Sequence, residues 1–283
     1  MSERRSTDIR FLQSKSRVVR QKILEAVAFA GKGHLGGALS VTDILVTLIF
    51  GGFARVGSAD AVSDLILSKG HAGVALYAAL SEYGVVDLDL LNSLNQNSRL
   101  GEHPDRFING VSFCTGSLGH GIGLGSGVAL ARKLDDRMQS VYVVMGDGEC
   151  YEGSVWEAAI FASGKTLSNL CVVIDRNGLI THGATEDIMP LNDLAQKWRS
   201  FGWDVFSVDG HSHLQLSEFF SARQSRLVSG QQKKPCVLLA NTIKGKGVSF
   251  MENIPAWHHG GFQGDQLESA LKEISLLGRD IES

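Results

Sequence analysis

The 283-residue sequence lacks the features of several protein classes. It has no run of about 18 apolar residues and no secretory signal pattern, so we expect neither a membrane-spanning helix nor secretion. Its four cysteines include no CxxC pair, which argues against a disulfide scaffold or zinc site and favours a reducing cytoplasm. A net charge of -3 without a long basic run argues against a general nucleic-acid-binding surface.

Repeats, low-complexity stretches and a convincing domain boundary are also absent, whereas 33 glycines are present and concentrate in motifs. Such glycines indicate close approach of the backbone to a ligand. Segments of strand and helix composition alternate, which is typical of a doubly wound, mainly parallel α/β sheet with helices on both faces. We therefore predict a single domain over residues 1–283, with 1–14 as a flexible leader.

The individual elements follow from apolar periodicity and from glycine-containing breaks. We expect strands at residues 64–68, 141–145, 170–175, 203–208 and 235–242. We expect helices at residues 8–30, 40–50, 69–83, 89–97, 116–134, 152–165, 191–200, 214–228 and 266–277, with a loop at residues 100–110. Ser40 or Thr42 is the expected cap of the second helix.

The most informative motif is Gly146-Asp147-Gly148, which follows one expected strand, with Asn177 following the next. A helical segment between them predicts a strand–helix–strand unit, which places both polar residues at the ligand-binding edge of the sheet. With the Leu179 carbonyl they offer hard oxygens that suit Mg²⁺, or Ca²⁺, beside a diphosphate. GDG alone is common in turns, so the prediction depends on Asn177 and on motifs elsewhere. The unit resembles the thiamine diphosphate motif.

Five further blocks occur in the chain. They are Gly33–Gly36, Ser68–His71, Gly101–Asp105, Thr115–Gly121, and Lys244–Gly247 followed by Trp257-His258. Each block is weak alone, but the six in this order are specific, and over residues 15–262 the chain resembles the N-terminal part of transketolases. It differs from the family's usual residues at positions that flank the site, namely Leu35, Ser117, His120 and Arg176.

The resemblance implies an enzyme that uses thiamine diphosphate to move a two-carbon ketol unit from a ketose to an aldose. It implies a metal site at Asp147, Asn177 and Leu179. The cofactor-binding residues that it implies are His71, Gly116, Ser117, Leu118, Gly146, Gly148, Glu149, Asp175 and Asn177. The catalytic residues that it implies are His34, His103 and His258, which line the substrate channel, and Glu152 and Glu157, which link the two active sites of a dimer.

Histidine suits this channel because its near-neutral pKa allows it to donate or accept a proton from a sugar hydroxyl. The other histidines, which we expect to be structural or solvent-exposed, are His120, His182, His211, His213 and His259.

The family's pyrimidine-binding and C-terminal domains have no counterpart before Ser283, so the resemblance implies a separate C-terminal partner subunit in an α2β2 assembly. One alternative is another thiamine diphosphate enzyme, either a deoxyxylulose-phosphate synthase-like chain or a 2-oxoacid dehydrogenase α subunit. The Gly101–Asp105 block and Trp257-His258 favour transketolase over both. A non-catalytic scaffold would not need Asp147 and Asn177, and an unrelated nucleotide-binding protein is disfavoured by the lack of Walker and Rossmann glycine motifs. The sequence does not identify the ketose, the aldose or the pathway.

Overall fold

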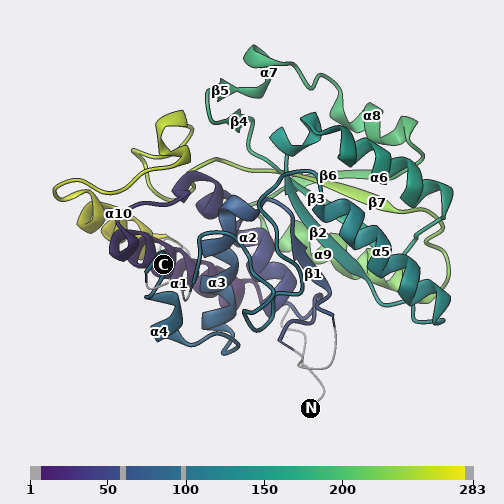
Figure 1. The fold of residues 1–283 in the computed structure, drawn as a ribbon, viewed down its shortest axis with the longest axis horizontal. Coiled ribbons are helices and arrows are strands. Elements are labelled where there is room, and N and C mark those ends of the chain that lie inside the picture. The colour runs from purple at the N-terminus through teal and green to yellow at the C-terminus, as the bar shows by residue number, and fades with distance from the viewer. Residues whose placement is uncertain (1–7, 58–61, 97–99, 278–283) are drawn as a thin grey trace.

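The computed structural model describes residues 8–57, 62–96 and 100–277. Its centre is a five-stranded sheet with the order β1-β2-β3-β7-β6, in which all neighbouring strands are parallel (Figure 1). The strands are β1 (Leu65–Leu67), β2 (Val141–Gly146), β3 (Leu170–Arg176), β6 (Asp204–Asp209) and β7 (Cys236–Asn241). All five lie where the sequence predicts strands, and the parallel α/β fold is confirmed.

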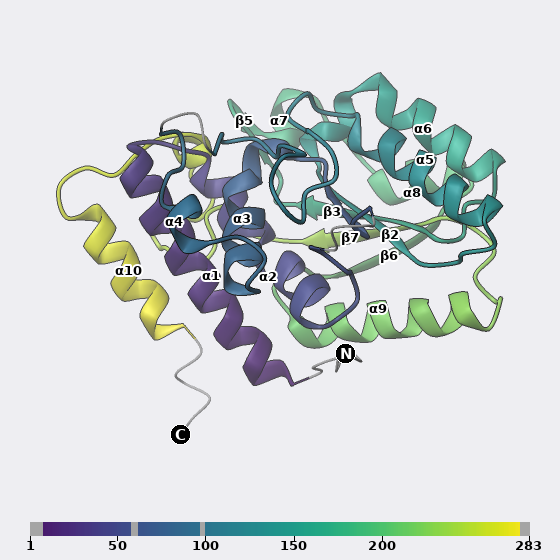
Figure 2. The ribbon, with the colours of Figure 1, turned by 60° about the horizontal axis from the view of Figure 1, so that its bottom comes forward.

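Helices cover both faces of this sheet (Figure 2). One face carries α5 (Gly121–Leu134), α6 (Gly153–Gly164) and α8 (Leu194–Ser200). The other carries α1 (Ile9–Ala30), α2 (Leu35–Phe50), α3 (Gly73–Glu82) and α9 (His213–Val228). The last helix, α10 (Gln266–Leu276), packs on α1.

Burial on both faces explains why the strand sequences are continuously apolar. In β2, Tyr142 and Val144 enter the core beneath α2 and α9, whereas Val141, Val143 and Met145 enter the core beneath α5 and α6. All five side chains are completely buried. The alternation follows from the two-residue period of a strand.

The strands follow one another in space in sequence order up to β3, but β7 and not β6 lies next to β3. After β3 the chain passes along the face of α8 to the outer strand β6, and it then returns through α9 on the opposite face to β7. The loops that leave β3 and β7 therefore diverge at the carboxyl edge, where α/β sheets form their ligand-binding crevice. The GDG–Asn unit lies at this edge, because β2, α6 and β3 form the predicted strand–helix–strand unit.

The second helix starts earlier than predicted, at Leu35, so the expected cap residues Ser40 and Thr42 lie inside it. Their hydroxyls bond elsewhere: Ser40 Oγ donates to the Asp175 carboxylate at 2.6 Å, and Thr42 Oγ1 donates to the Ala38 carbonyl at 2.9 Å. Tertiary packing of a helix buried all round overrides the weak preference of these hydroxyl residues for a cap.

The glycine-rich helix starts later than predicted, at Gly121 instead of Gly116. Gly116 and Gly119 have φ angles of 150° and 85°, which glycine adopts readily and which cannot continue a right-handed helix. A Cβ on Gly70 would lie 2.6 Å from the backbone nitrogen of Gly116, so two loops meet here backbone to backbone. The segment before α5 is therefore a tight loop.

The short elements were predicted least well. Helix α4 spans only Leu88–Leu91, and its expected extension to 97 passes in part outside the described residues. Unpredicted elements are the hairpin β4 (Leu179–Ile180) with β5 (Gly183–Ala184), α7 (Thr185–Ile188), and the 3₁₀ turns η1 (Gly70–Ala72), η2 (Gly148–Tyr151) and η3 (Pro255–His258). The expected leader lies partly outside the described residues, and Asp8 already caps α1.

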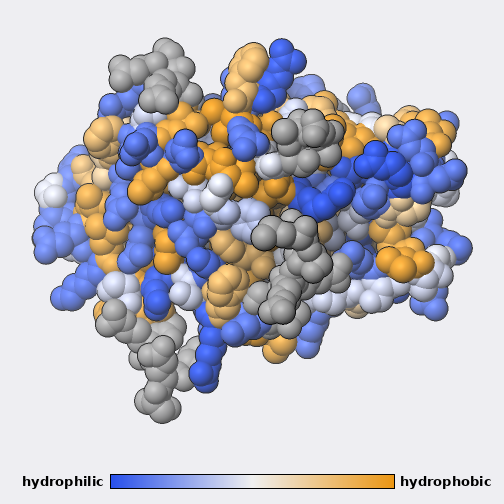
Figure 3. All heavy atoms as spheres, turned by 90° about the horizontal axis from the view of Figure 1, so that it is seen from below, coloured by the Kyte–Doolittle hydropathy of each residue, from blue (hydrophilic) through white to orange (hydrophobic). Residues whose placement is uncertain are grey.

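The surface is mixed in polarity. None of the described helices combines the length and the apolar character needed to cross a bilayer. On the face in Figure 3, hydrophobic side chains gather in a band across the upper middle, between more hydrophilic areas. Phe107, in the loop that follows the Gly101–Asp105 block, is 83% exposed.

Candidate functional site

A cavity of about 320 Å³ lies at the carboxyl edge of the sheet. Its wall brings together segments that are far apart in the sequence. The lining residues are His34, Gly37, Lys69, His71, His103, Gly116, Leu118, Gly146, Asp147, Gly148, Glu149, Asn177, Leu179, Ile180, Thr181, Lys244 and His258. A larger hollow of about 1000 Å³ includes Ser140 and Ser168, which precede β2 and β3, so it lies at the opposite edge, away from the motifs.

The three predicted metal-binding residues meet on one side of the cavity. Asp147 is 2% exposed, and its carboxylate accepts hydrogen bonds from the backbone N–H groups of Gly148 at 2.8 Å and Gly178 at 2.7 Å. Asn177 Oδ1 accepts from the Leu179 N–H at 3.2 Å. Burial raises the pKa of Asp147, although the hydrogen bonds from the Gly178 and Gly148 N–H groups oppose this shift. A buried carboxylate in this situation fits a cation.

Lys244 was not predicted as a site residue, although it belongs to the Lys244–Gly247 block. Its ammonium donates to the Leu179 carbonyl at 3.0 Å, the third oxygen of the expected metal site, and to His258 Nδ1 at 2.8 Å. Burial and the nearby Lys69 ammonium lower the pKa of Lys244 to about 8. Lys244 therefore adds a cation on the side where the diphosphate is expected.

The four histidines predicted to serve the site lie together. The ring of His34 is 5.4 Å from that of His71, 6.2 Å from that of His103 and 5.3 Å from that of His258. Burial and the Lys69 ammonium hold the pKa of His71 well below its usual value. Burial and the Lys244 ammonium lower the pKa of His258 to about 3. Both rings are therefore neutral at physiological pH.

A buried ion pair between Lys69 and Asp175 lies next to the cavity, and the sequence did not predict it. Lys69, from the Ser68–His71 block, donates to the Asp175 carboxylate and to the Gly37 carbonyl at 3.1 Å. Both side chains of the pair are at most 1% exposed. Asp175 also accepts from Thr242, which follows β7. Asp175 is not among the lining residues and supports Lys69 through this ion pair, and its expected contact with the cofactor stays a prediction.

Glu149 lines the cavity, as predicted, and its carboxylate accepts hydrogen bonds from three loops. Its carboxylate accepts from the Ser68 hydroxyl, from the Gly119 N–H at 2.8 Å and from the Gly146 N–H at 3.3 Å. The residue is 2% exposed, and burial raises its pKa. These bonds connect the loops at Ser68, Gly119 and Gly146, and the expected contact of Glu149 with the cofactor stays a prediction.

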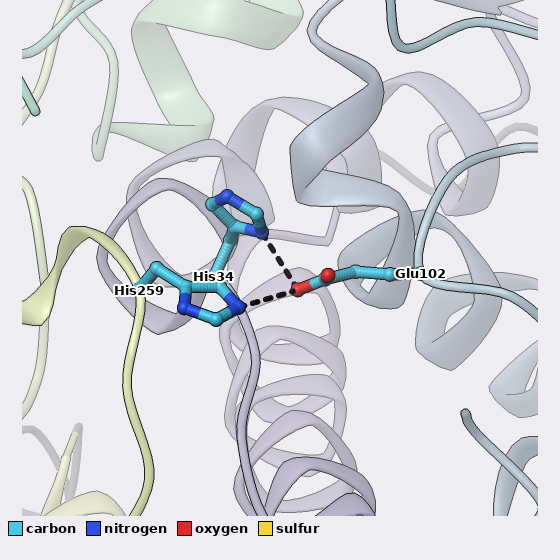
Figure 4. Close-up of side chains that lie close together, drawn as sticks. All are labelled: His34, Glu102 and His259. Atoms are coloured by element: carbon cyan, nitrogen blue, oxygen red, sulfur yellow. Dashed lines mark hydrogen bonds and ion pairs between the residues drawn. The ribbon is translucent and has the colours of Figure 1, made fainter. Parts of the chain in front are cut away.

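Two further residues beside the cavity were not predicted to act together, Glu102 and His259. Glu102 Oε1 lies 2.6 Å from His34 Nδ1 and 3.7 Å from His259 Nε2. Figure 4 shows the three side chains converging from separate segments. Their ligand atoms all lie within 4.8 Å of one another, a spacing that a metal ion could bridge, but the 2.6 Å contact is that of a hydrogen bond.

Two segments that are far apart in the sequence meet at this wall. Gly33 and Gly260 form an antiparallel bridge, with N–H to carbonyl distances of 2.9 Å and 3.0 Å. The bridge fixes His34 beside the segment that carries His258 and His259, and the His259 ring is 4.5 Å from that of His34. His259 is exposed and lies beside the cavity without lining it, so the expected structural or solvent role stays a prediction.

Besides Asp175, three predicted site residues are not among those that line the cavity. Ser117 is exposed between the lining residues Gly116 and Leu118. Glu152 and Glu157 are exposed at the start and on the surface of α6, and Glu157 lines a separate surface hollow with Gly119 and His120. The two glutamates were expected to act between two copies of the enzyme, so their role stays a prediction.

Two of the remaining histidines are structural, as expected. His211 Nδ1 lies 2.7 Å from the Asp43 carboxylate, and His211 Nε2 accepts from the Ile243 N–H at 2.8 Å. His213 lies 2.8 Å from Thr47 Oγ1 and 3.5 Å from Asp43. This buried network supports the loop that precedes Lys244.

Comparison with known proteins agrees with the geometry. Residues 13–277 match the family model described as "Transketolase, thiamine diphosphate binding domain". The chain belongs to the transketolase family. It is 40% identical over 273 residues to the 6-deoxy-6-sulfo-D-fructose transketolase subunit SqwG of Clostridium sp., covering 94% of this chain and 97% of that protein. It is 38% identical over 268 residues to one subunit of the apulose-4-phosphate transketolase of Phocaeicola vulgatus, covering 93% and 94%.

Longer transketolases match over their thiamine diphosphate-binding part. Human transketolase is 35% identical over 273 residues, which are 93% of this chain and 42% of the human protein. The crystal structure of Campylobacter jejuni transketolase superposes with a TM-score of 0.85 at 25% identity, covering 95% of this chain and 43% of that chain. The chain is thus a transketolase subunit of the N-terminal kind.

Proposed function

We propose that this subunit, joined to a C-terminal transketolase subunit, forms a thiamine diphosphate- and Mg²⁺-dependent ketol transferase. The observation that carries the proposal is the shared cavity of Asp147, Asn177 and Leu179 with His34 and His71. Such a cavity offers oxygen ligands for a cation at one end and imidazoles for a hydroxylated substrate at the other.

Magnesium and the cofactor diphosphate fit the part of the cavity that Asp147, Asn177 and Leu179 line. Asp147 and Asn177 supply side-chain oxygens, and the Leu179 carbonyl supplies the third. A Cβ on Gly146 would meet nothing within 4 Å, so the backbone there leaves open space for phosphate oxygens. In the structure the Lys244 ammonium donates to the Leu179 carbonyl. A bound diphosphate would attract this ammonium and leave the carbonyl oxygen free for the metal ion. Magnesium rather than calcium is our assignment, because a diphosphate site leaves room for waters.

The bound thiamine supplies the electron sink for cleaving and forming the carbon–carbon bond. His71, buried beside Lys69, contacts the diphosphate end. His34, His103 and His258 contact the substrate hydroxyls and carbonyl, where an imidazole can hold or move a proton. Glu149 and the Lys69–Asp175 pair keep these loops in place.

A partner subunit fits both the relatives and the surface. The longer transketolases include more than half their length beyond the matched part, and two relatives that match almost end to end are named as subunits. Phe107, exposed beside the Glu102–His103 loop, is suited to contact such a chain. We assign an α2β2 assembly in the cytoplasm, in which Glu152 and Glu157 on α6 face a second copy.

The substrates are sugars or sugar phosphates. The two subunit relatives carry names that refer to apulose 4-phosphate and to 6-deoxy-6-sulfo-D-fructose, which are both ketoses. We therefore assign a ketose donor and an aldose acceptor, either of which can carry an anionic group at the end remote from the reacting carbons.

The test is reconstitution. The purified chain with thiamine diphosphate, Mg²⁺, a ketose phosphate and an aldose phosphate should give negligible transfer. Addition of a C-terminal transketolase subunit from the same organism should restore turnover, and Asp147→Ala should abolish the restoration. Robust turnover by the single chain would refute the need for a partner. A folded complex that binds the cofactor but transfers nothing from a panel of ketoses would support a scaffold instead.

A further inference from the structure

Two imidazoles and one carboxylate from separate segments converge at a common point beside the cavity. His34 immediately precedes α2, Glu102 lies in the loop between α4 and α5, and His259 follows η3. Glu102 Oε1 lies 2.6 Å from His34 Nδ1 and 3.7 Å from His259 Nε2 (Figure 4). The three ligand atoms all lie within 4.8 Å of one another. This is a spacing at which one metal ion reaches all three.

A hydrogen bond explains the position of His34 but not that of His259. The 3.7 Å separation between His259 and Glu102 is too long for a hydrogen bond, yet the His259 nitrogen points at the same oxygen that His34 contacts (Figure 4). Within the part of the chain that the structure describes, the His259 side chain has no hydrogen bond. Its nitrogen is therefore directed at Glu102 without a proton-sharing partner there.

The carboxylate is held in the form that binds metal ions. Burial would raise the pKa of Glu102, but the hydrogen bond from His34 and the nearby imidazoles outweigh burial, and the pKa is lowered. An ionised carboxylate between two imidazoles supplies negative charge and nitrogen lone pairs together, and metal ligands must be deprotonated in this way.

The backbones that carry the three side chains are fixed by contacts of their own. Gly33 and Gly260, which adjoin the two histidines, form the antiparallel bridge with distances of 2.9 Å and 3.0 Å. The loop of Glu102 is held by Tyr77, whose hydroxyl donates to the His103 carbonyl at 2.7 Å. Ligands held in place by their surroundings lose little freedom when an ion binds.

The distances suit a tetrahedral ion. Zn²⁺ binds imidazole nitrogen and carboxylate oxygen at about 2.0–2.2 Å, which places tetrahedral ligand atoms about 3.4 Å apart. The distances from Glu102 Oε1, 2.6 Å and 3.7 Å, lie on either side of this value, so small side-chain rotations would bring both close to it. The ion would take the place of the proton between His34 Nδ1 and Glu102. Two imidazoles favour Zn²⁺ or Co²⁺ over Mg²⁺, which prefers oxygen ligands.

We propose that His34, Glu102 and His259 form a binding site for Zn²⁺ or a similar divalent transition-metal ion, separate from the magnesium site expected at Asp147. The His259 side chain is 36% exposed, so the ion enters from solvent, and three protein ligands leave a fourth position for water. Because His34 also lines the cavity, the bound ion immobilises that ring and adds two positive charges beside the cavity. Inhibition of ketol transfer follows, and this consequence rests on the proposed function.

Co²⁺ tests the site in the full chain, without partner or substrate. Four-coordinate Co²⁺ with imidazole ligands absorbs visible light intensely, whereas Co²⁺ in an octahedral oxygen shell, as expected at Asp147, absorbs weakly. We expect intense bands that saturate at one ion per chain and disappear when Zn²⁺ is added. A wild-type chain that gives no such bands would overturn the proposal.

Substitutions then locate the ion. Glu102→Gln and His259→Asn should each weaken Co²⁺ binding by about tenfold or more, with thermal melting as the check that both variants fold. The matched controls are His182→Asn, which removes an exposed imidazole in the β4–β5 turn, and Cys114→Ser, which removes the exposed thiol. Both controls should keep the bands. Wild-type affinity in the two site variants, or loss of the bands in either control, would refute the assignment.

The consequence for activity is measured in the complex with the partner subunit, with thiamine diphosphate and excess Mg²⁺. Zn²⁺ should inhibit transfer, and a zinc-selective chelator should restore it. His259→Asn, compared with its own rate without zinc, should need about tenfold more Zn²⁺ or more for the same fractional inhibition. Equal sensitivity would overturn the inhibitory role. A complex that transferred nothing even without zinc would refute the proposed function, whereas the Co²⁺ spectrum would still decide the metal site.

Discussion

The Lys69 ammonium and the Asp175 carboxylate form a buried ion pair that spans the sheet beneath the cavity. Lys69 follows β1 and Asp175 lies in β3, so the pair joins the two strands on either side of β2. The strand between them carries Asp147 at its end. The pair thus holds the loops around the expected metal site at a fixed separation.

Replacing Lys69 by methionine should destabilise the chain strongly. The substitution leaves Asp175 charged and buried without a cation, which costs about 3–5 kcal/mol in comparable pairs. Urea unfolding of the cofactor-free chain measures the loss. The double variant Lys69→Met/Asp175→Asn removes the uncompensated charge and should recover part of it, and a double variant as unstable as the single one would show that the pair is not the cause.

Asp147→Asn should separate cofactor binding from folding. Gly148 N–H and Gly178 N–H donate to different oxygens of Asp147, and asparagine has only one oxygen, so the cofactor-free chain should lose one buried hydrogen bond. The loss should be about 1–3 kcal/mol, partly offset because burial already disfavours the ionised carboxylate, and the chain should stay folded. Thiamine diphosphate affinity with Mg²⁺ should fall at least tenfold, which is about 1.4 kcal/mol. Calorimetric titration of the assembled enzyme measures it, with the exposed Asp89→Asn as control. Unchanged affinity would exclude Asp147 as a ligand.

His103→Ala and His71→Ala should have different effects. His103 is exposed and its ring lies against Gly116, so its removal should leave folding and cofactor affinity near wild type. Turnover should fall by about 10- to 1,000-fold, the range of a lost acid–base or transition-state contact. His71→Ala should mainly raise the thiamine diphosphate concentration for half activity. Steady-state kinetics and thermal melting distinguish the two, and unfolding of His103→Ala with normal specific activity would make His103 structural.

The network around Asp43 should make stability depend on acid pH. Burial alone would raise the pKa of Asp43, but the Arg20 guanidinium, at 2.6 Å, and His211 hold it well below 3.8. A lowered pKa contributes stability that is complete above the unfolded value and is lost as the pH falls through the folded value. Asp43→Asn should therefore be much less stable than wild type at pH 7, and the gap in unfolding free energy should narrow below about pH 4. A gap of equal size at pH 7 and pH 3 would contradict this.

The sequence predicted the sheet well because β1, β2, β3 and β7 are buried almost throughout and therefore have apolar sequences, whereas β6 is only partly buried. It also predicted the cavity histidines, because His34, His71 and His103 belong to blocks with glycine or proline neighbours. It placed the start of α2 wrongly because packing overrides cap preference at Ser40. It missed Lys69, Lys244 and Glu102 as site residues because their roles come from partners more than a dozen residues away, such as Asp175 and His34.

The bridge between Gly33 and Gly260 determines when this site can exist during synthesis. The wall that holds His34 needs Gly260, 227 positions after Gly33, so a ribosome must synthesise the chain past Gly260 before the wall can close. Contacts of such long sequence separation form late, after local helices and neighbouring strands. The sheet and the edge that carries Asp147 can therefore assemble first, and the cavity is completed only after the segment around Gly260 has emerged.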